Sequence, residues 1–234
     1  MIDFHSHFLP KMDDGSKSCE MSLEMLKTSY AQGIDTMVAT PHFYIKQNTA
    51  ERFLERRSAA YDKLKKHISA SGDKVPDIIL GAEVYFFRGI AHYDGLEGLK
   101  IENTDHLLLE MPFEQWNART LDEVEAIKEE TGITPVIAHL DRYLDYQRGT
   151  DNVERLVDMG FPIQMNSEFI NGFFTRRKAI ELITDGTVSV LGSDCHNMDK
   201  RSPDLGKSLQ IIEKKCGADT VDKIYRTSKM LLGL

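Results

Sequence analysis

The sequence is poor in cysteine and short of basic residues, and each shortage excludes a class of protein. Its 234 residues include three cysteines, Cys19, Cys195 and Cys216. An odd number of widely separated cysteines does not suit a disulfide framework and favours a reducing compartment. With 29 Lys and Arg against 37 Asp and Glu, the formal net charge is -8. A nucleic-acid or anionic-membrane partner is therefore not expected, because both need a basic surface.

Long apolar runs are also missing. No segment approaches the roughly 20 apolar residues of a membrane-spanning helix, and the stretch Met1–His5 has neither the basic nor the apolar region of a signal peptide. We therefore expect a cytoplasmic protein without membrane insertion. Flexible linkers, low-complexity tracts and internal repeats are absent too, so the simplest interpretation is one domain over residues 1–234.

The chain contains short apolar runs that alternate with longer helical patterns. The seven predicted strands are Ile2–His5, Ile34–Thr40, Ile78–Gly81, Leu107–Glu110, Pro135–Ala138, Pro162–Met165 and Val188–Gly192. The predicted helices are Glu20–Gln32, Thr49–Ala70, Leu121–Glu130, Asn152–Met159, Thr175–Thr184, a helix from an N-cap at Ser202 with Pro203 at its first position to Lys215, and Thr220–Leu232.

This alternation predicts an α/β fold in which a parallel sheet closes into a TIM-barrel-like structure. The common barrel has eight strands, so a barrel of seven is expected to be distorted or incomplete. The alternative is an open, doubly wound sheet. It is less favoured because no glycine-rich phosphate loop, such as G-x-G-x-x-G, follows a predicted strand.

Polar residues with metal-binding side chains follow the predicted strands. Six of the seven strands are followed by His, Asp or Glu; with Asn166 after the remaining strand, the residues are His5, His7, His42, Glu83, Glu110, His139, Asn166, Asp194 and His196. The C-terminal ends of barrel strands meet at one rim. Carboxylates gathered there would repel one another unless cations lay between them. Nitrogen and oxygen ligands without thiolates favour Zn, Mn or Fe.

A second chemistry is also compatible with part of the sequence. Cys195 and Arg201 satisfy the C-x5-R spacing of cysteine-dependent phosphatases, in which a thiolate attacks phosphorus. The intervening segment has no glycine to let backbone amides surround a phosphate. A cysteine mechanism would also leave the His and Glu residues at the other strand ends unexplained. We therefore expect the spacing to be coincidental.

Six motifs, in order, resemble those of the PHP (polymerase and histidinol phosphatase) superfamily, most closely its bacterial tyrosine-phosphatase branch of CpsB/YwqE-type capsule regulators. They are Met1-Ile-Asp-Phe-His-Ser-His, Asp13-Asp-Gly-Ser-Lys, Ala39-Thr-Pro-His, Gly81-Ala-Glu-Val-Tyr, Ile137-Ala-His-Leu-Asp-Arg-Tyr and Ser193-Asp-Cys-His-Asn. The resemblance implies a distorted (β/α)7 barrel that holds three divalent metal ions, typically manganese or iron. The ligands it implies are His5, His7, Asp14, His42, Glu83, Glu110, His139, Asp194 and His196, of which Asp14 rests on the resemblance alone.

The function that the resemblance implies is hydrolysis of phosphotyrosine in proteins by a metal-activated hydroxide, in opposition to a bacterial tyrosine kinase that controls exopolysaccharide or capsule production. Arg142 and Arg201 are expected to bind the phosphate, since a guanidinium pairs well with phosphate oxygens; surface salt bridges are the alternative role for both. Two other functions stay open: a phosphatase of a small phosphomonoester such as histidinol phosphate, and a non-catalytic metal-binding module that serves as a partner of a kinase or polymerase.

Overall fold

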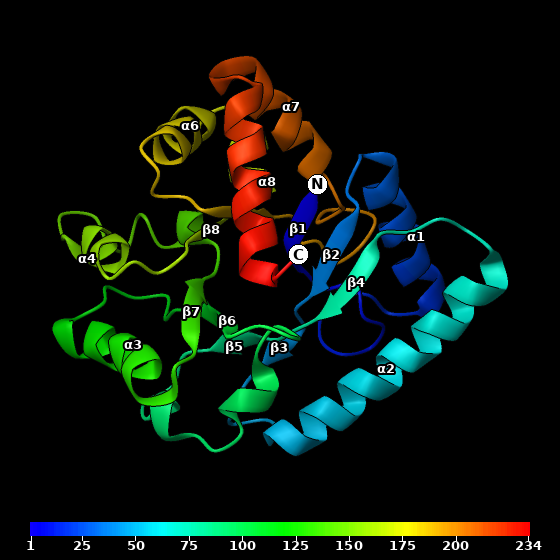
Figure 1. Ribbon diagram of the computed structural model, residues 1–234, viewed down its shortest axis with the longest axis horizontal. Helices are drawn as coiled ribbons and strands as arrows, with labels where there is room; N and C mark the ends of the chain where they lie inside the picture. The colour runs from blue at the N-terminus through cyan, green and yellow to red at the C-terminus, as the bar shows by residue number, and fades with distance from the viewer.

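The computed structural model describes residues 1–234 as parallel strands surrounded by helices (Figure 1). The strands are β1 (Ile2–Ser6), β2 (Thr36–Ala39), β3 (His42–Phe43), β4 (Asp77–Leu80), β5 (Glu83–Tyr85), β6 (His106–Glu110), β7 (Thr134–Ile137), β8 (Gln164–Asn166) and β9 (Val190–Gly192). The α-helices are α1 (Cys19–Ala31), α2 (Ala50–Ser71), α3 (Ala118–Thr131), α4 (Asn152–Asp158), α5 (Ser167–Asn171), α6 (Arg176–Thr184), α7 (Leu205–Cys216) and α8 (Ala218–Leu232). Short 3-10 helices are η1 (Ile90–His92), η2 (Leu96–Leu99) and η3 (Leu140–Arg142).

The nine strand segments form a ring of seven strands. Their hydrogen-bonded orders are β1-β2-β4, β3-β5-β6-β7 and β8-β9, and every pairing is parallel. Only two residues separate β2 from β3, and only two separate β4 from β5, so each pair continues one strand. Bridges from Ile137 to Ile163 and from Ser6 to Cys195 join the remaining edges. The distorted seven-stranded barrel predicted from the sequence is confirmed.

Two apolar layers hold this ring together. Alternate residues of the strands, among them Phe4, Val38 and Leu108, form an inner cluster that Leu231 and Leu232 of α8 complete. Figure 1 shows α8 in front of the strands, and this helix packs against β1 and β9. The residues of opposite parity point outward and pack in a larger cluster with the helices. A parallel strand covered on both faces reads as a continuous apolar run, which is why the strands were visible in the sequence.

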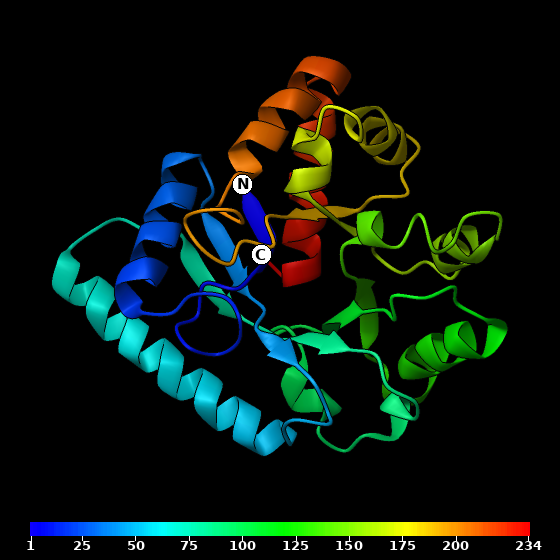
Figure 2. The ribbon, with the colours of Figure 1, turned by 180° about the vertical axis from the view of Figure 1, so that it is seen from behind.

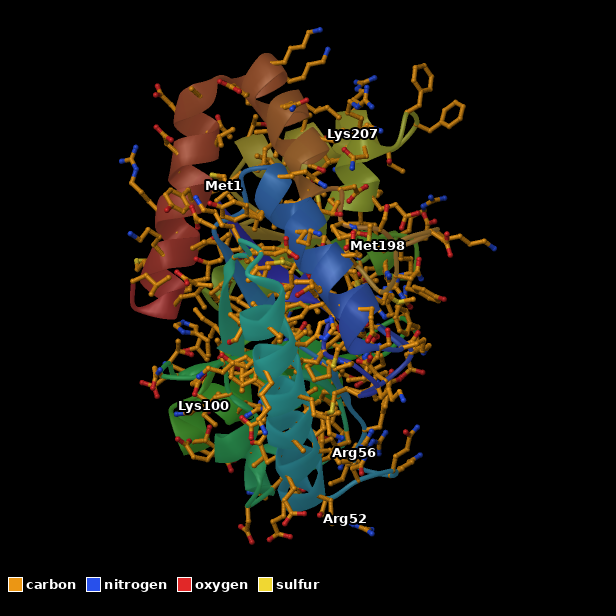
Figure 3. All side chains as sticks on the ribbon, turned by 90° about the vertical axis from the view of Figure 1, so that its right-hand side faces the viewer. Met1, Arg52, Arg56, Lys100, Met198 and Lys207 are labelled. Carbon is orange, nitrogen blue, oxygen red and sulfur yellow. The ribbon has the colours of Figure 1, made fainter.

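The loops that follow the strands lie at one end of the barrel. Viewed from behind, the loops that follow β1 and β9 lie in front of the strands (Figure 2). In the side view, Met1 at the start of β1 and Met198 in the loop after β9 lie toward opposite sides (Figure 3). The C-terminal ends of the strands therefore form a rim distinct from the end where the chain begins.

A β-bulge in β1 directs its histidines. Asp3 pairs with Met37 and Ser6 pairs with Ala39, so β1 holds one residue more than β2 between these positions. An extra residue shifts the alternation of side chains between the two faces. Phe4 can therefore remain in the inner cluster while both His5 and His7 reach the rim.

The predicted helices are confirmed, with ends shifted by up to three residues, except at the start of α7. This helix begins at Leu205 after Asp204, so the prediction of an N-cap at Ser202 and a first position at Pro203 is wrong. The Asp204 carboxylate accepts hydrogen bonds from Ser167 and Asn171 and thereby ties the start of α7 to α5. The five-residue α5 itself was not predicted. No helix has the length and apolar composition needed to cross a membrane.

Candidate metal centre

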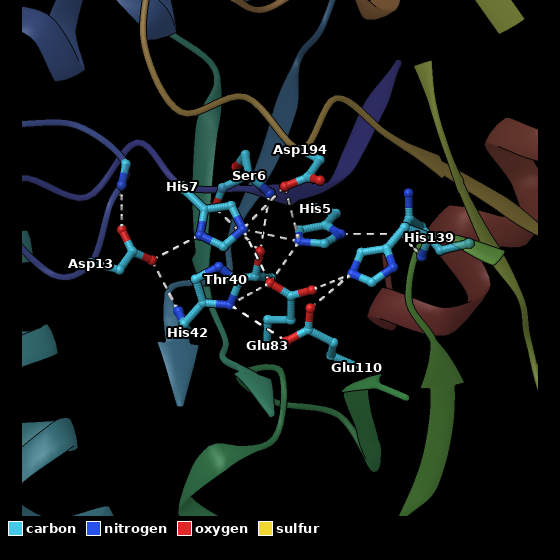
Figure 4. Close-up of polar contacts among 12 residues, drawn as sticks. His5, Ser6, His7, Asp13, Thr40, His42, Glu83, Glu110, His139 and Asp194 are labelled. Carbon is cyan, nitrogen blue, oxygen red and sulfur yellow. Dashed lines mark hydrogen bonds and ion pairs between the residues drawn. The ribbon is translucent and has the colours of Figure 1, made fainter. Parts of the chain in front are cut away.

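Side chains from opposite ends of the sequence converge at the rim (Figure 4). The Nε2 atoms of His5 and His7 lie 3.0 Å apart. Each lies 3.2 Å from Oε2 of Glu83. Oδ1 of Asp194 lies 3.6 Å from Nε2 of His5 and 3.3 Å from Nε2 of His7. Four of the predicted ligands therefore place donor atoms around one point.

Glu83 connects this group to a second one. Its Oε1 atom lies 2.8 Å from Nε2 of His139, which is also 3.4 Å from Oε1 of Glu110. Its Oε2 atom lies 2.9 Å from Nδ1 of His42, and that nitrogen is 3.9 Å from Oε2 of Glu110. A carboxylate with an oxygen in each group is the arrangement expected of a bridging ligand in a metal cluster.

A third group completes the predicted set. Ring nitrogens of His7, His42 and His196 all lie within 4.8 Å of one another. Oδ1 of Asp14 lies 3.3 Å from Nε2 of His196 and 3.7 Å from Nε2 of His42. Asp14 is exposed on the loop after β1, yet its carboxylate faces this group. All nine predicted ligands are thus brought together.

Fixed acceptors orient two of the imidazoles. Nδ1 of His5 lies 3.0 Å from Oε1 of Gln164, which also accepts the His139 main-chain N–H at 2.7 Å. Nδ1 of His7 lies 2.8 Å from Oδ2 of Asp13. Because these oxygens can only accept, each Nδ1 donates its N–H to one of them, and the Nε2 atom of each ring is thereby turned toward the other ligand atoms. Such partners are typical of metal-bound histidines.

His196 is held in the same way. Its Nδ1 donates to the main-chain oxygen of Asp194 at 2.9 Å, which leaves Nε2 without a proton. Burial and the neighbouring His7 lower the pKa of His196 to about 3, so its imidazole stays neutral at physiological pH. A neutral imidazole is the form that binds a metal ion.

The remaining charges indicate that the cluster needs cations. Burial opposes the charge on His139, but Glu110 and Glu83 raise its pKa to about 9. Burial alone would raise the pKa of Glu83, yet His5 and His42 hold it well below its usual range. Buried atoms that face the cluster and have no hydrogen-bond partner are Nδ1 of His42, Oε2 of Glu83, Oε2 of Glu110 and Nε2 of His196. Buried nitrogen and oxygen atoms without hydrogen-bond partners are costly, and these four are of the kind that coordinate divalent metal ions.

Two of these residues have a strained backbone. His139 has a φ of 30° and Asp194 a φ of 51°, and only Lys11 and Asn103 share positive φ among the residues other than glycine. Left-handed conformations cost free energy in residues with a Cβ and are concentrated at functional sites. Each turns a side chain into the cluster immediately beyond a strand.

Two positioning residues were missed by the sequence analysis. Gln164 is a buried polar side chain within a strand that was read as apolar, and this contrast could have singled it out. Asp13 precedes the predicted ligand Asp14 and, besides His7, accepts the main-chain N–H of His42 at 2.9 Å. Burial would raise the pKa of Asp13, but His7 and the N–H of His42 hold it well below its usual range. Nothing in the local sequence distinguished the two adjacent aspartates.

Both predicted phosphate-binding arginines reach the rim. Nη2 of Arg142 lies 2.5 Å from Oδ2 of Asp194, and Nη2 of Arg201 lies 2.7 Å from Oδ1 of the same carboxylate. Their side chains are 32% and 31% exposed, so part of each guanidinium remains open to a ligand. Asn166 also donates to Oδ2 of Asp194, at 2.9 Å, and lines a small cavity with the two arginines.

The cysteine-dependent alternative does not fit the structure. Cys195 is fully buried and belongs to the larger apolar cluster, in which the strands pack against the helices. Burial, followed by the charge of Asp3, raises the pKa of the Cys195 thiol far above its usual value. A buried, protonated thiol is not a nucleophile, so the C-x5-R spacing is coincidental, as predicted.

Comparisons with known proteins point to one family. The model of the family described as "Capsular polysaccharide synthesis, CpsB/CapC" matches residues 1–232. The tyrosine-protein phosphatase CpsB of Streptococcus pneumoniae is 32% identical to this chain over 96% of the chain and 95% of its own length. The tyrosine-protein phosphatase YwqE of Bacillus subtilis is 27% identical over 99% of this chain and 91% of its own.

A solved structure agrees with these relatives. It comes from work on YwqE of Bacillus subtilis and CpsB of Streptococcus pneumoniae, described there as metal-dependent tyrosine phosphatases. It matches this chain with a TM-score of 0.86 and 26% identity, covering 100% of this chain and 94% of its own. The resemblance predicted from the six motifs is therefore confirmed along the whole barrel.

Proposed function

This chain belongs to the CpsB/CapC family, and from that membership and the geometry of its rim we propose that it is a metal-dependent phosphatase that hydrolyses phosphotyrosine in proteins. The observation that carries the proposal is the convergence of buried histidines and carboxylates whose ring nitrogens and carboxylate oxygens face one another. Ligand residues from His5 to His196 join one rim, which supports treating residues 1–234 as a single catalytic domain.

We infer that His5, His7, Asp14, His42, Glu83, Glu110, His139, Asp194 and His196 hold three divalent metal ions. Manganese is the metal that we expect, with iron and zinc as the alternatives. The three overlapping groups of donor atoms support the number three, and the absence of a thiolate among the donors supports a metal of intermediate hardness. Ions bound there would neutralise the charge of a phosphate dianion and lower the pKa of a bound water toward neutrality.

The protein's own contribution is to hold and orient the phosphate. Arg142 approaches Asp194 from the segment after β7 and Arg201 from the loop after β9, and each has donors left for phosphate oxygens. The leaving group of phosphotyrosine is a phenolate whose parent pKa is about 10. It therefore needs less protonation than an alkoxide, and the reaction does not depend on a strong general acid at the rim.

The partner that we propose is a tyrosine kinase of the same bacterium. CpsB/CapC is a family of capsular polysaccharide synthesis, and phosphotyrosine must be formed before it can be removed. A kinase in that process, or one of its phosphorylated substrates, is the protein on which we expect this chain to act. We place the reaction in the cytoplasm, and the three free cysteines support a reducing compartment.

The test is a comparison of substrates. The protein is loaded with manganese, and the kcat/KM values for a phosphotyrosine peptide and for histidinol phosphate are measured. We expect the peptide to be preferred. A strong preference for histidinol phosphate would replace this proposal with a small-molecule phosphatase. Full metal loading without turnover of either substrate would instead favour a non-catalytic metal-binding module.

A further inference from the structure

An exposed aromatic ring lies directly beside the buried cluster. Phe113 follows Glu110 by three residues, and its ring centroid lies 5.9 Å from that of His139, with the planes 14° apart. The residue is nevertheless 40% exposed. One side of the ring therefore covers a predicted metal ligand, while another part of the ring is exposed to solvent.

The inner side of this ring is held by a buried tyrosine. The ring centroids of Phe113 and Tyr143 lie 5.4 Å apart. The Tyr143 hydroxyl accepts the Met111 N–H at 2.8 Å, and its ring packs against Trp116 at 5.2 Å. Tyr143 is fully buried, so it gives Phe113 a fixed support, and little entropy remains to be lost when a ligand contacts Phe113.

A second exposed ring extends the same surface. The centroid of Tyr146 lies 6.4 Å from that of Phe113, at an angle of 61°, and Tyr146 is 45% exposed. The segment from His139 to Tyr146 also carries Arg142. One short stretch of chain thus carries a predicted metal ligand, a predicted phosphate-binding group and an exposed ring that packs against Phe113.

We propose that Phe113 and Tyr146 form an aryl-binding wall, defined by these two rings, on which the phenyl ring of the substrate lies while its phosphate is held by Arg142 and Arg201. The inference rests on the proposed phosphatase function and adds to it the source of selectivity for aryl over alkyl phosphates. Stacked or edge-on aromatic pairs contribute enough free energy to change affinity by about 3- to 10-fold.

A purely structural role for Phe113 predicts a different result. If its ring only shielded His139 from water, truncation would weaken the binding of every phosphate-like ligand alike. An aryl-binding wall affects only ligands that carry a ring. Phosphonates separate the two roles because they resemble the phosphate ester but have no leaving group, so their binding does not depend on turnover.

The experiment measures calorimetric dissociation constants of phenylphosphonate and methylphosphonate for the manganese-loaded protein. In Phe113→Leu we expect phenylphosphonate to bind about 3- to 10-fold more weakly and methylphosphonate to bind unchanged. Phe113→Tyr, which keeps a ring, should restore the preference. The matched control is Phe174→Leu, because Phe174 is 94% exposed and its ring is paired with that of Phe173, not with any ring at the rim.

Other outcomes would overturn the aryl-binding wall. If Phe113→Leu weakens the binding of both phosphonates equally, the ring has only a shielding role. If the binding of neither phosphonate changes, Phe113 does not contact the ligand. If Phe113→Leu does not fold, the same two dissociation constants are measured for Tyr146→Leu, which removes the second ring of the wall. We then expect only phenylphosphonate to bind more weakly. Failure of the proposed function is seen separately, as absence of phosphotyrosine turnover in the unaltered protein, while phosphonate binding still reports on the wall.

Discussion

The cluster and its rim are built on different principles. The cluster atoms of His5, His7, Glu83 and His139 are buried, and these residues lie in a strand or within two residues of its end. Arg142, by contrast, lies farther from the strands, at the end of η3, and is partly exposed. The buried part fixes where metal ions can lie, and the rim decides which phosphate ester can approach them. Changes to the first should remove catalysis, and changes to the second should alter its efficiency.

The largest loss of activity is expected when a buried ligand is removed. We expect His139→Ala to lower kcat/KM for a phosphotyrosine peptide by at least about 1,000-fold, because catalysis by bound metal is lost and the Glu83 and Glu110 carboxylates lose the group between them. Metal analysis of the variant should show substoichiometric binding.

The control for this variant is His92→Ala, since His92 is an exposed residue that pairs only with Glu130. Its activity should match that of the unaltered protein. Full activity of His139→Ala would contradict the assignment of the buried cluster to catalysis.

A positioning residue should have a smaller effect than a ligand. Asp13→Ala removes the acceptor that keeps the Nδ1 proton on His7, and we expect metal affinity to fall by about 10- to 100-fold. Titration of the metal-free protein with manganese, followed by activity, measures this change. Asp145→Ala is the control, because Asp145 is exposed and pairs only with Arg148. Unchanged affinity in Asp13→Ala would show that the orientation of His7 does not depend on this carboxylate.

A change at the rim should leave the metals in place. Arg142→Lys keeps the charge but loses the fork of guanidinium donors, and we expect kcat/KM to fall by about 10- to 100-fold. Manganese content should remain unchanged. Arg148→Lys, at an exposed position of the same segment, should retain full activity. Loss of metal together with activity in Arg142→Lys would show that the rim and the cluster are not separable.

The smallest effect on activity is expected at Cys195. Cys195→Ser should keep most of the turnover, because the thiol is buried within the larger apolar cluster. It should still reduce the free energy of unfolding by about 1–3 kcal/mol, since a hydroxyl is placed in an apolar environment. Denaturant unfolding and phosphatase assays check both statements. If Cys195→Ser folds normally but is inactive, the result would favour the cysteine-dependent mechanism instead.

The sequence predicted the barrel and most of the cluster for one physical reason. Strands covered on both faces leave continuous apolar runs, and a polar residue such as Glu83 or His139 at the end of a run stands out. The β-bulge in β1 left no such pattern, because it depends on pairing with β2. Gln164 acts through partners far away in the sequence, and the start of α7 depends on a contact between Asp204 and α5. Long-range hydrogen bonds of this kind cannot be read from local composition.

Metal analysis of the purified protein, combined with turnover of a phosphotyrosine peptide before and after chelation, tests the central claim most directly. The account predicts bound divalent metal, loss of turnover when EDTA removes it, and recovery when manganese is restored. Undiminished turnover by a protein shown to be free of metal would contradict it.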